Sequence, residues 1–180
     1  MTAPTMLDRE RTALVVVDVQ RAFAKAVAEF DRVAQATRKL IQAAHLLELP
    51  VVVTEQYPQG LGPTVESVAE LLDGDLRLEK RRFAACDAEG FELFGRSQVV
   101  LCGIEAHVCV AQTALLLLRR GLEVHLVVDA VASRHERDRE VALRRLEQAG
   151  VVPQTVESVL FELIRGADHP RFKDVQELVK

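Results

Sequence analysis

Short apolar runs alternate with longer segments of helical period along most of the chain, and this alternation limits the possible folds more than any other feature. Runs rich in Val, Leu and Ile predict six β-strands at 12–18, 50–55, 76–80, 98–103, 123–129 and 151–153. Four of these runs are continuous stretches of β-branched residues or Leu, as in strands that helices cover on both faces. The pattern predicts an α/β fold of stacked βαβ units around a parallel sheet.

Helical segments fill the intervals between the apolar runs. Apolar residues between Val33 and Leu47 recur at steps of three and four, which predicts a helix over about 30–48. Further helices are predicted at 65–72, 108–120, 137–149 and 156–165. Clustered Gly, Pro and polar residues predict loops at 55–64 and 81–90. We expect a three-layer, doubly wound sheet of order 3-2-1-4-5-6, with ligands bound beyond the carboxyl ends of strands 1 and 4.

Composition and charge exclude several kinds of partner. The 180 residues are 49% apolar and 28% charged, so we expect residues 1–180 to form one globular domain. The net charge is −4 with both signs interspersed, which argues against nucleic acid or an anionic membrane as partner. No targeting signal is recognised at the start, and no apolar run reaches the roughly 18 residues of a membrane span. The three cysteines lack disulfide or zinc spacing, and a reducing cytoplasm fits them best.

Cys109 begins a helical run shortly after the fourth predicted strand and its Gly103. Backbone N–H groups and the positive end of a helix would stabilise a thiolate there, and the same N–H groups could bind an oxyanion. This position predicts that Cys109 is the most acidic of the three thiols. A free cysteine is equally often a small buried apolar residue, and position alone does not decide between the two.

Two charged residues end the first and third predicted strands. Asp18 closes the first strand, where an unpaired charge is costly to bury, although it could also be a turn or capping residue. Lys80 ends the third strand and lies in the run EKRRF, which could be only a solvated face. Together with Cys109 they would make a coherent set of nucleophile, proton acceptor and stabilising cation facing one cleft.

The remaining cysteines and histidines carry weaker signals. His107 is a competing base, but at two residues' separation on a helix its side chain would diverge from Cys109 by about 200°. Cys102 lies inside a predicted strand and is expected in the core, whereas Cys86 lies in a predicted loop and is expected to be exposed. The other histidines share no metal-ligand spacing.

Five motifs in order, VVVDVQ, TEQYPQGLGPT, EKRRF, GIEAHVCVAQTALLLLRRGLEV and VVDAVASR, resemble those of the isochorismatase-like cysteine hydrolases. The similarity runs over about 12–172 and is greatest to the isochorismatase-domain-containing branch. The resemblance implies a Rossmann-like six-stranded sheet and a triad of Asp18, Lys80 and Cys109. It also implies a cis peptide between Ile104 and Glu105, and an oxyanion hole formed by the backbone N–H groups of Glu105 and Cys109.

The matching motifs also suggest what surrounds the triad. Residues in or beside them are expected to shape a substrate pocket: Gln20, Phe23, Gln56, Tyr57 and Phe83. Gln20 and Phe23 could equally be structural. Nicotinamidase relatives carry an Asp-x-His metal site after strand 2, where this chain reads TEQYP. We therefore expect no metal and no cofactor, and nicotinamidase activity is disfavoured.

The resemblance leaves three functions open. Isochorismatases proper can act on a vinyl ether without a cysteine, so Cys109 favours hydrolysis of a small amide-like C–N bond through a thiolate and an acyl-enzyme. The alternatives are an isochorismatase-type ether hydrolase and a non-catalytic member that binds a small molecule or a protein. We also expect a homo-oligomer, because the run ALLLLRRG and the tail over 156–180 are rich in Leu, Val and Phe. A terminal helix folded back over its own sheet is the alternative.

Overall fold

The computed structural model describes residues 6–180 and contains one six-stranded parallel sheet. Its order is β3-β2-β1-β4-β5-β6, which confirms the predicted α/β topology. The strands are β1 (Thr12–Val17), β2 (Val51–Gln56), β3 (Leu76–Lys80), β4 (Gln98–Ile104), β5 (Glu123–Ala132) and β6 (Val152–Gln154). The chain order reverses between β1 and β4, and at such a point the carboxyl ends of two neighbouring strands open a crevice for ligands.

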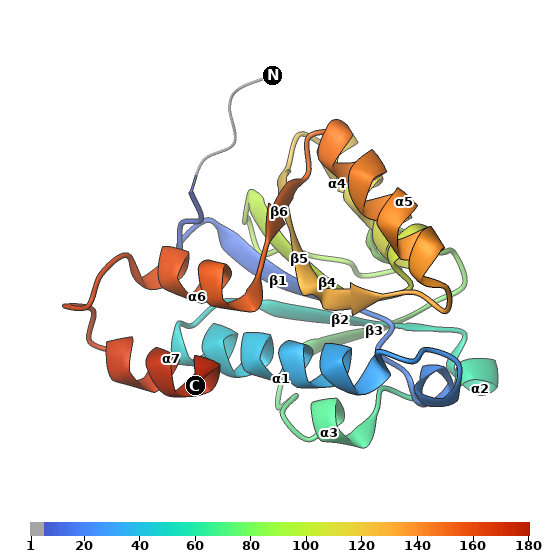
Figure 1. Cartoon of the computed structure of the whole chain (residues 1–180), viewed down its shortest axis with the longest axis horizontal. Coiled ribbons are helices and arrows are strands. Elements are labelled where there is room, and N and C mark those ends of the chain that lie inside the picture. The colour runs from blue at the N-terminus through green and yellow to red at the C-terminus, as the bar shows by residue number, and fades with distance from the viewer. Residues whose placement is uncertain (1–5) are drawn as a thin grey trace.

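Helices cover both faces of the sheet (Figure 1). One face carries α1 (Phe30–Leu46), α6 (Val156–Ile164) and α7 (Phe172–Val179), and the other carries α4 (Ala111–Arg119) and α5 (Glu136–Gln148). β1 shows why its sequence is continuously apolar. Leu14 and Val16 join the core beneath α1, while Val15 and Val17 join the core on the opposite face, so every position of the strand is buried.

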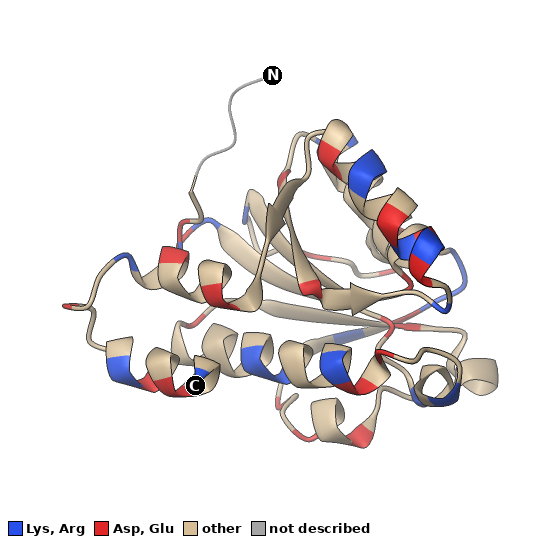
Figure 2. Cartoon of the chain, in the orientation of Figure 1, with Lys and Arg blue, Asp and Glu red and all other residues tan. Residues whose placement is uncertain are grey.

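Shorter helices form the connections at the carboxyl edge and beside it. They are η1 (Arg21–Lys25), α2 (Pro58–Leu61), α3 (Glu66–Ala69), η2 (Ala85–Asp87) and the π-helical turn η3 (Ala106–Val110). None of the helices in residues 6–180 is long and apolar enough to cross a bilayer. Figure 2 shows basic and acidic residues mixed along α1 and α5, as the interspersed sequence predicts.

The structure differs from the predicted elements in several places. The single helix predicted over 108–120 is divided into η3 and α4, and the loop predicted over 55–64 contains the end of β2 and α2. β5 extends to Ala132 because it pairs with β4 again after a register shift. The chain end forms α7, which packs against α1 and α6. The tail is thus the folded-back terminal helix that was the alternative to an oligomer contact.

Gly103 allows β4 to approach β1 closely beside the crevice. It pairs with Val17 in the sheet and has a φ of 123°, in the region that favours glycine. A Cβ atom built on Gly103 would lie 1.9 Å from the carbonyl oxygen of Val17. Any other residue would therefore force apart the two strands whose ends carry Asp18 and the turn of Cys109.

β5 buries a histidine in the core. His125 has no exposed surface, and its Nε2 lies 3.3 Å from a carboxylate oxygen of Glu123. Its Nδ1 has no hydrogen-bond partner within the described part of the chain. Burial lowers the pKa of His125 below its ordinary value, against the opposing effects of Glu123 and Glu162. The folded protein therefore favours the neutral ring.

We expect His125 to make the protein less stable in mild acid. The pKa of His125 is lowered in the folded state. Below pH 6.5, its ordinary pKa, the unfolded chain therefore binds a proton at this residue more readily than the folded chain does. Above that pH, the contribution of His125 to the free energy of unfolding is fully present. This contribution decreases as the pH falls below that value. His125→Leu should remove this part of the pH dependence, measured by urea unfolding between about pH 7.5 and about pH 5.5.

His135→Leu is the matched control, because it makes the same substitution at an exposed histidine. It should keep the wild-type dependence of unfolding free energy on pH. Equal slopes for wild type and His125→Leu would contradict the prediction.

Candidate active site

Asp18 and Cys109 meet at the crevice between the ends of β1 and β4. Asp18 directly follows β1 and has a φ of 53°, a left-handed conformation that turns the chain sharply at the strand end. Cys109 lies in η3, four residues after Glu105, which a cis peptide bond joins to Ile104. Their side chains lie close enough for the charge of Asp18 to raise the pKa of Cys109, although 91 positions separate them in the sequence.

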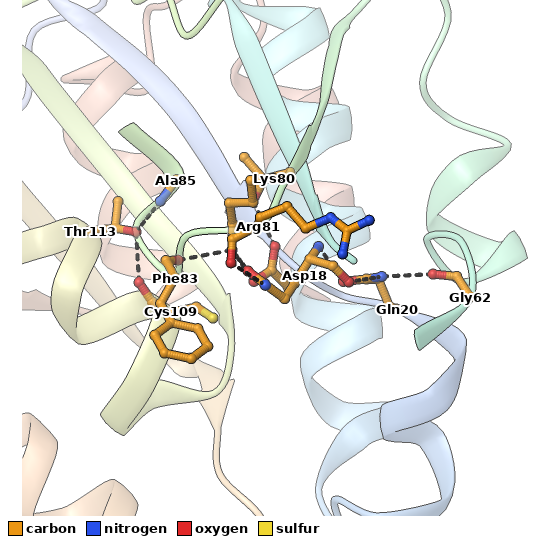
Figure 3. A network of polar contacts seen from close by, with 11 residues as sticks. Asp18, Gln20, Gly62, Lys80, Arg81, Phe83, Ala85, Cys109 and Thr113 are labelled. Atoms are coloured by element: carbon orange, nitrogen blue, oxygen red, sulfur yellow. Dashed lines mark hydrogen bonds and ion pairs between the residues drawn. The ribbon is translucent and has the colours of Figure 1, made fainter. Parts of the chain in front are cut away.

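Lys80 completes this group from the end of β3. Its Nζ lies 2.7 Å from Oδ2 of Asp18, and both side chains are almost fully buried. Figure 3 shows the two side chains pointing toward each other, with Cys109 beside them. The structure therefore brings together Asp18, Lys80 and Cys109, the three residues that the sequence placed at strand ends.

Burial dominates the acidity of the carboxyl and the thiol. It raises the pKa of Asp18, while Lys80 and hydrogen bonds from Lys80, Cys109 and Thr54 oppose the rise. Burial also raises the pKa of Cys109 to about 12, the charge of Asp18 adds to the rise, and the charge of Lys80 opposes it. The resting thiol is therefore protonated, and the Asp18 carboxyl beside it is a stronger base than an ordinary aspartate.

The prediction that Cys109 is the most acidic thiol is wrong for this resting state. Its pKa is raised to about 12, as is that of Cys102, which lies in the core of β4. Cys86 is also buried rather than exposed, because η2 folds it against the sheet, and burial raises its pKa too. A helix start does not make Cys109 acidic here, because desolvation outweighs the favourable charges. The thiolate needs a proton acceptor within the site.

Lys80 touches more than Asp18. Its Nζ also lies 2.8 Å from Oε1 of Gln56 and 2.8 Å from the carbonyl oxygen of Phe83. Three oxygen atoms thus match the three N–H donors of an ammonium group. These contacts tie the end of β2 and the segment after β3 to the same buried cation.

The five residues predicted to contact substrate differ in how far their side chains are exposed to solvent. Tyr57 and Phe83 are 42% and 49% exposed, so their rings are open to a ligand. Gln20 is fully buried, and its amide bonds the backbone of Gln56 and Gly62. Phe23 packs partly buried against the core beneath α1. These contacts support the structural alternative for Gln20 and Phe23, because both side chains are already engaged within the fold.

Gln56 and Tyr57 are each held by a neighbour from the segment after β3. Gln56 donates from Nε2 to the carbonyl oxygen of Arg81, 2.9 Å away. The guanidinium of Arg81 stacks on the ring of Tyr57, with 4.5 Å between its carbon and the ring centre. These contacts fix the rim of the crevice on the side of β2 and β3.

Glu105 is anchored beside the nucleophile turn. Its carboxylate is buried and accepts hydrogen bonds from the backbone N–H and the side-chain Nε of Arg134, at 2.9 and 3.0 Å. Its carbonyl oxygen accepts from the N–H groups of Val108 and Val110. Both ends of this residue are therefore fixed, and with them the direction of its peptide.

His107 turns away from the triad. Its Nδ1 lies 2.9 Å from Oγ of Ser133, and its Nε2 lies 3.9 Å from a carboxylate oxygen of Asp138 in α5. These contacts agree with the expected divergence from Cys109. Asp18 lies at the same site as the thiol and its charge acts on the pKa of Cys109, so it is the better placed proton acceptor.

Two threonines support the site and were missed from the sequence. Thr54 donates from Oγ1 to Oδ1 of Asp18 at 2.8 Å, and Thr113 donates to the carbonyl oxygen of Cys109 at 2.6 Å. Thr113 also accepts from the N–H of Ala85 at 2.8 Å, which joins η2 to the nucleophile turn (Figure 3). The available signals were a polar residue near the end of an apolar strand and a hydroxyl four positions after Cys109.

We expect activity to survive exhaustive chelation. Residues 6–180 contain no group of three or more His, Cys, Asp or Glu side chains arranged to hold a metal ion. The buried ammonium of Lys80 already supplies a positive charge that stabilises the anions of the site. Treatment with a strong chelator followed by gel filtration should leave the rate unchanged. Loss of activity that zinc or iron restores would contradict this expectation.

The chain is similar to several known proteins over most of its length. The family described as "Isochorismatase domain" matches residues 12–158. Isochorismatase domain-containing protein 2A of Mus musculus is 43% identical over 174 residues, which cover 95% of this chain and 84% of that protein. The human isochorismatase domain-containing protein 2 is 44% identical over 172 residues, or 94% of this chain and 83% of that protein.

Solved structures show the same fold. A structure described as the MAR1 ribonuclease of Caenorhabditis elegans has a TM-score of 0.92 and 42% identity, covering 97% of this chain and 92% of that one. YcaC of Escherichia coli, described as an octameric hydrolase of unknown specificity, has a TM-score of 0.86 and 26% identity, covering 99% and 97%. YcaC of Pseudomonas aeruginosa, described with covalent acrylamide, has a TM-score of 0.90 and 26% identity, covering 99% and 93%.

Proposed function

The chain belongs to the isochorismatase family, and from this premise we propose that it is a cysteine hydrolase of small amide-like C–N bonds. The single observation that carries the proposal is the buried trio: the Cys109 thiol beside Asp18, which is itself paired with Lys80. A thiol, a carboxylate of raised pKa and a fixed cation are the parts of an activated nucleophile.

The proposed reaction has two halves. Asp18 accepts the thiol proton, and the Cys109 sulfur attacks the substrate carbonyl to give a tetrahedral oxyanion, which the backbone N–H groups of Glu105 and Cys109 stabilise. The C–N bond then breaks, and ammonia or an amine leaves with the proton from Asp18. Water, deprotonated by Asp18, attacks the thioester and releases a carboxylic acid and the thiol. Lys80 stays protonated throughout and favours both the carboxylate and the thiolate.

The exposed rings of Tyr57 and Phe83 are proposed to contact the substrate. They lie beside the residues that hold Lys80, since Phe83 supplies its carbonyl oxygen and Tyr57 follows Gln56. Rings open on one face favour a small substrate with an apolar or planar part. The covalent acrylamide described for the Pseudomonas aeruginosa relative concerns a small amide on that protein, which is consistent with this substrate class.

Ribonuclease activity is the second candidate, because the Caenorhabditis elegans structure at 42% identity is described as a ribonuclease. The interspersed charges of this chain and its net charge of −4 disfavour a polyanionic substrate. Amide hydrolysis therefore ranks above RNA cleavage.

A substrate panel with product detection tests the proposal. Primary amides, vinyl ethers and an RNA oligonucleotide are each incubated with the protein, and an acid-quenched sample is examined by peptide mass spectrometry. We expect ammonia release from at least one amide, together with an acyl adduct on the peptide that contains Cys109. Turnover of vinyl ethers or RNA alone, without such an adduct, would overturn the amide proposal.

We also expect the protein to form a homo-oligomer. Leu115, Leu116 and Leu118 on α4 are only partly buried, and the Escherichia coli relative is described as octameric. Covering these side chains with a second copy would remove apolar surface from water. Multi-angle light scattering should give a multiple of 20.0 kDa at micromolar concentration. A mass equal to one chain would contradict the expectation.

A further inference from the structure

We propose that Gln56 is a positioning residue: it holds the Lys80 ammonium against Asp18 through a neutral acceptor, and thereby keeps the charge balance that the Cys109 thiolate needs. The inference rests on the roles proposed above for Lys80 and Cys109. It replaces the expectation that Gln56 contacts substrate, because both ends of its side-chain amide are engaged inside the protein.

Lys80 donates hydrogen bonds to one charged acceptor and two neutral ones. Of the three oxygens around Nζ, only Oδ2 of Asp18, at 2.7 Å, carries a formal negative charge. The other two, Oε1 of Gln56 and the carbonyl oxygen of Phe83, are neutral acceptors at 2.8 Å. The ammonium is therefore satisfied as a donor while the Asp18–Lys80 pair stays balanced, one charge against one.

The orientation of the Gln56 amide follows from its neighbours. Gln56 lies opposite Lys80 in the parallel register of β2 and β3. Its main-chain N–H and carbonyl are both bonded by the Gln20 side chain, at 2.7 and 3.0 Å, so its backbone cannot shift easily. Rotating the amide by 180° would place its NH2 group against the Lys80 ammonium and its oxygen against the carbonyl of Arg81. Both contacts would be repulsive, so only the observed orientation fits.

The charge of this acceptor matters because nearby charges shift the pKa of the Cys109 thiol. Burial and the charge of Asp18 raise the pKa of Cys109, and the charge of Lys80 lowers it. The surrounding elements carry further charged or titratable groups: Glu55 on β2, Arg77 and Glu79 on β3, Arg81 and Arg82 after β3, Cys86 and Asp87 on η2, Glu105, which is paired with Arg134, and His107. A second carboxylate on Lys80 would leave two negative charges sharing one cation, and the thiolate would then be disfavoured by like charge.

Alkylation of Cys109 tests the proposal without any substrate. Second-order rate constants for iodoacetamide are measured between about pH 6 and about pH 10, and the Cys109 peptide is quantified by mass spectrometry. Gln56→Glu keeps an acceptor of the same size but adds a charge, and should slow alkylation at least about tenfold at a given pH on the rising limb, equal to one unit of thiol pKa. Gln56→Met keeps the site neutral but releases the cation, and should also slow it.

Gln59→Glu is the matched control, since it adds the same charge on an exposed glutamine three positions along. Its rate should stay within about twofold of wild type, because water screens an exposed charge. An unchanged rate in Gln56→Glu, or an equal loss in Gln59→Glu, would overturn the proposal. If Gln56→Glu does not fold, a wild-type rate in Gln56→Met overturns it. A slowed Gln56→Glu in a protein that cleaves none of the amides would uphold the positioning role while the proposed function fails.

Discussion

Replacing Cys109 with Ala is expected to reduce kcat/KM at least about 10⁴-fold for any amide that the wild-type protein cleaves, a loss of roughly 5.4 kcal/mol of transition-state stabilisation. The reason is that the sulfur forms the bond to the acyl group, and neither Asp18 nor Lys80 can replace it as nucleophile. The rate of ammonia release, measured under single-turnover and steady-state conditions, gives the comparison.

Cys86→Ala is the matched control for this experiment. Cys86 is buried in the same apolar cluster as Cys109, but it belongs to η2. Neither Asp18 nor Lys80 is among the charged groups that shift its pKa. Its substitution should leave kcat/KM within about threefold of wild type, as expected for a small change away from reacting atoms. Full retention of activity in Cys109→Ala toward a vinyl ether would instead identify an ether hydrolase. A wild-type protein inactive on every compound would indicate a binding protein.

Replacing Lys80 with Met is expected to lower the free energy of unfolding by roughly 3–5 kcal/mol near neutral pH, because it leaves the carboxylate of Asp18 buried without its partner. Asp18 has no exposed surface, and Thr54 then remains as a side-chain donor to its carboxylate. Urea unfolding followed by circular dichroism measures the loss, and amide hydrolysis should be lost with it.

The pH dependence of this loss has a defined sign. Burial already raises the pKa of Asp18 in the wild type, and removal of the Lys80 charge raises it further. A carboxyl with a raised folded pKa contributes stability in acid, and this stability is lost as the pH rises through that pKa. The deficit of Lys80→Met should therefore shrink as the pH falls from neutrality toward the ordinary value of a carboxyl.

A double substitution completes the test. Asp18→Asn combined with Lys80→Met removes both charges, so it should recover most of the stability that Lys80→Met loses, while activity stays absent. A double variant as unstable as Lys80→Met alone would show that the lost lysine contacts, rather than the unpaired carboxylate, cause the destabilisation.

Most of the fold could be predicted because most of its strands and helices depend on a local pattern. Short windows of the sequence show the continuous apolar runs of strands that are buried on both faces. They also show the apolar residues spaced three and four positions apart between Val33 and Leu47. The tail was harder, since Phe172 and Val175 give only a short apolar stripe, and whether such a stripe packs on its own sheet or on another chain depends on surfaces far away in sequence. The boundary of β5 likewise depended on its register with β4.

The site shows the same division. The sequence by itself determined the parallel sheet, its helices and the strand-end positions of Asp18, Lys80 and Cys109, because these follow from short-range periodicity and from the topology that it implies. Only the tertiary structure decided the burial of Cys86, the amide orientations of Gln20 and Gln56, and the raised pKa of the Cys109 thiol. Desolvation and hydrogen bonding are set by atoms that the fold brings within a few ångströms from distant strands, and no local window of sequence contains those distances.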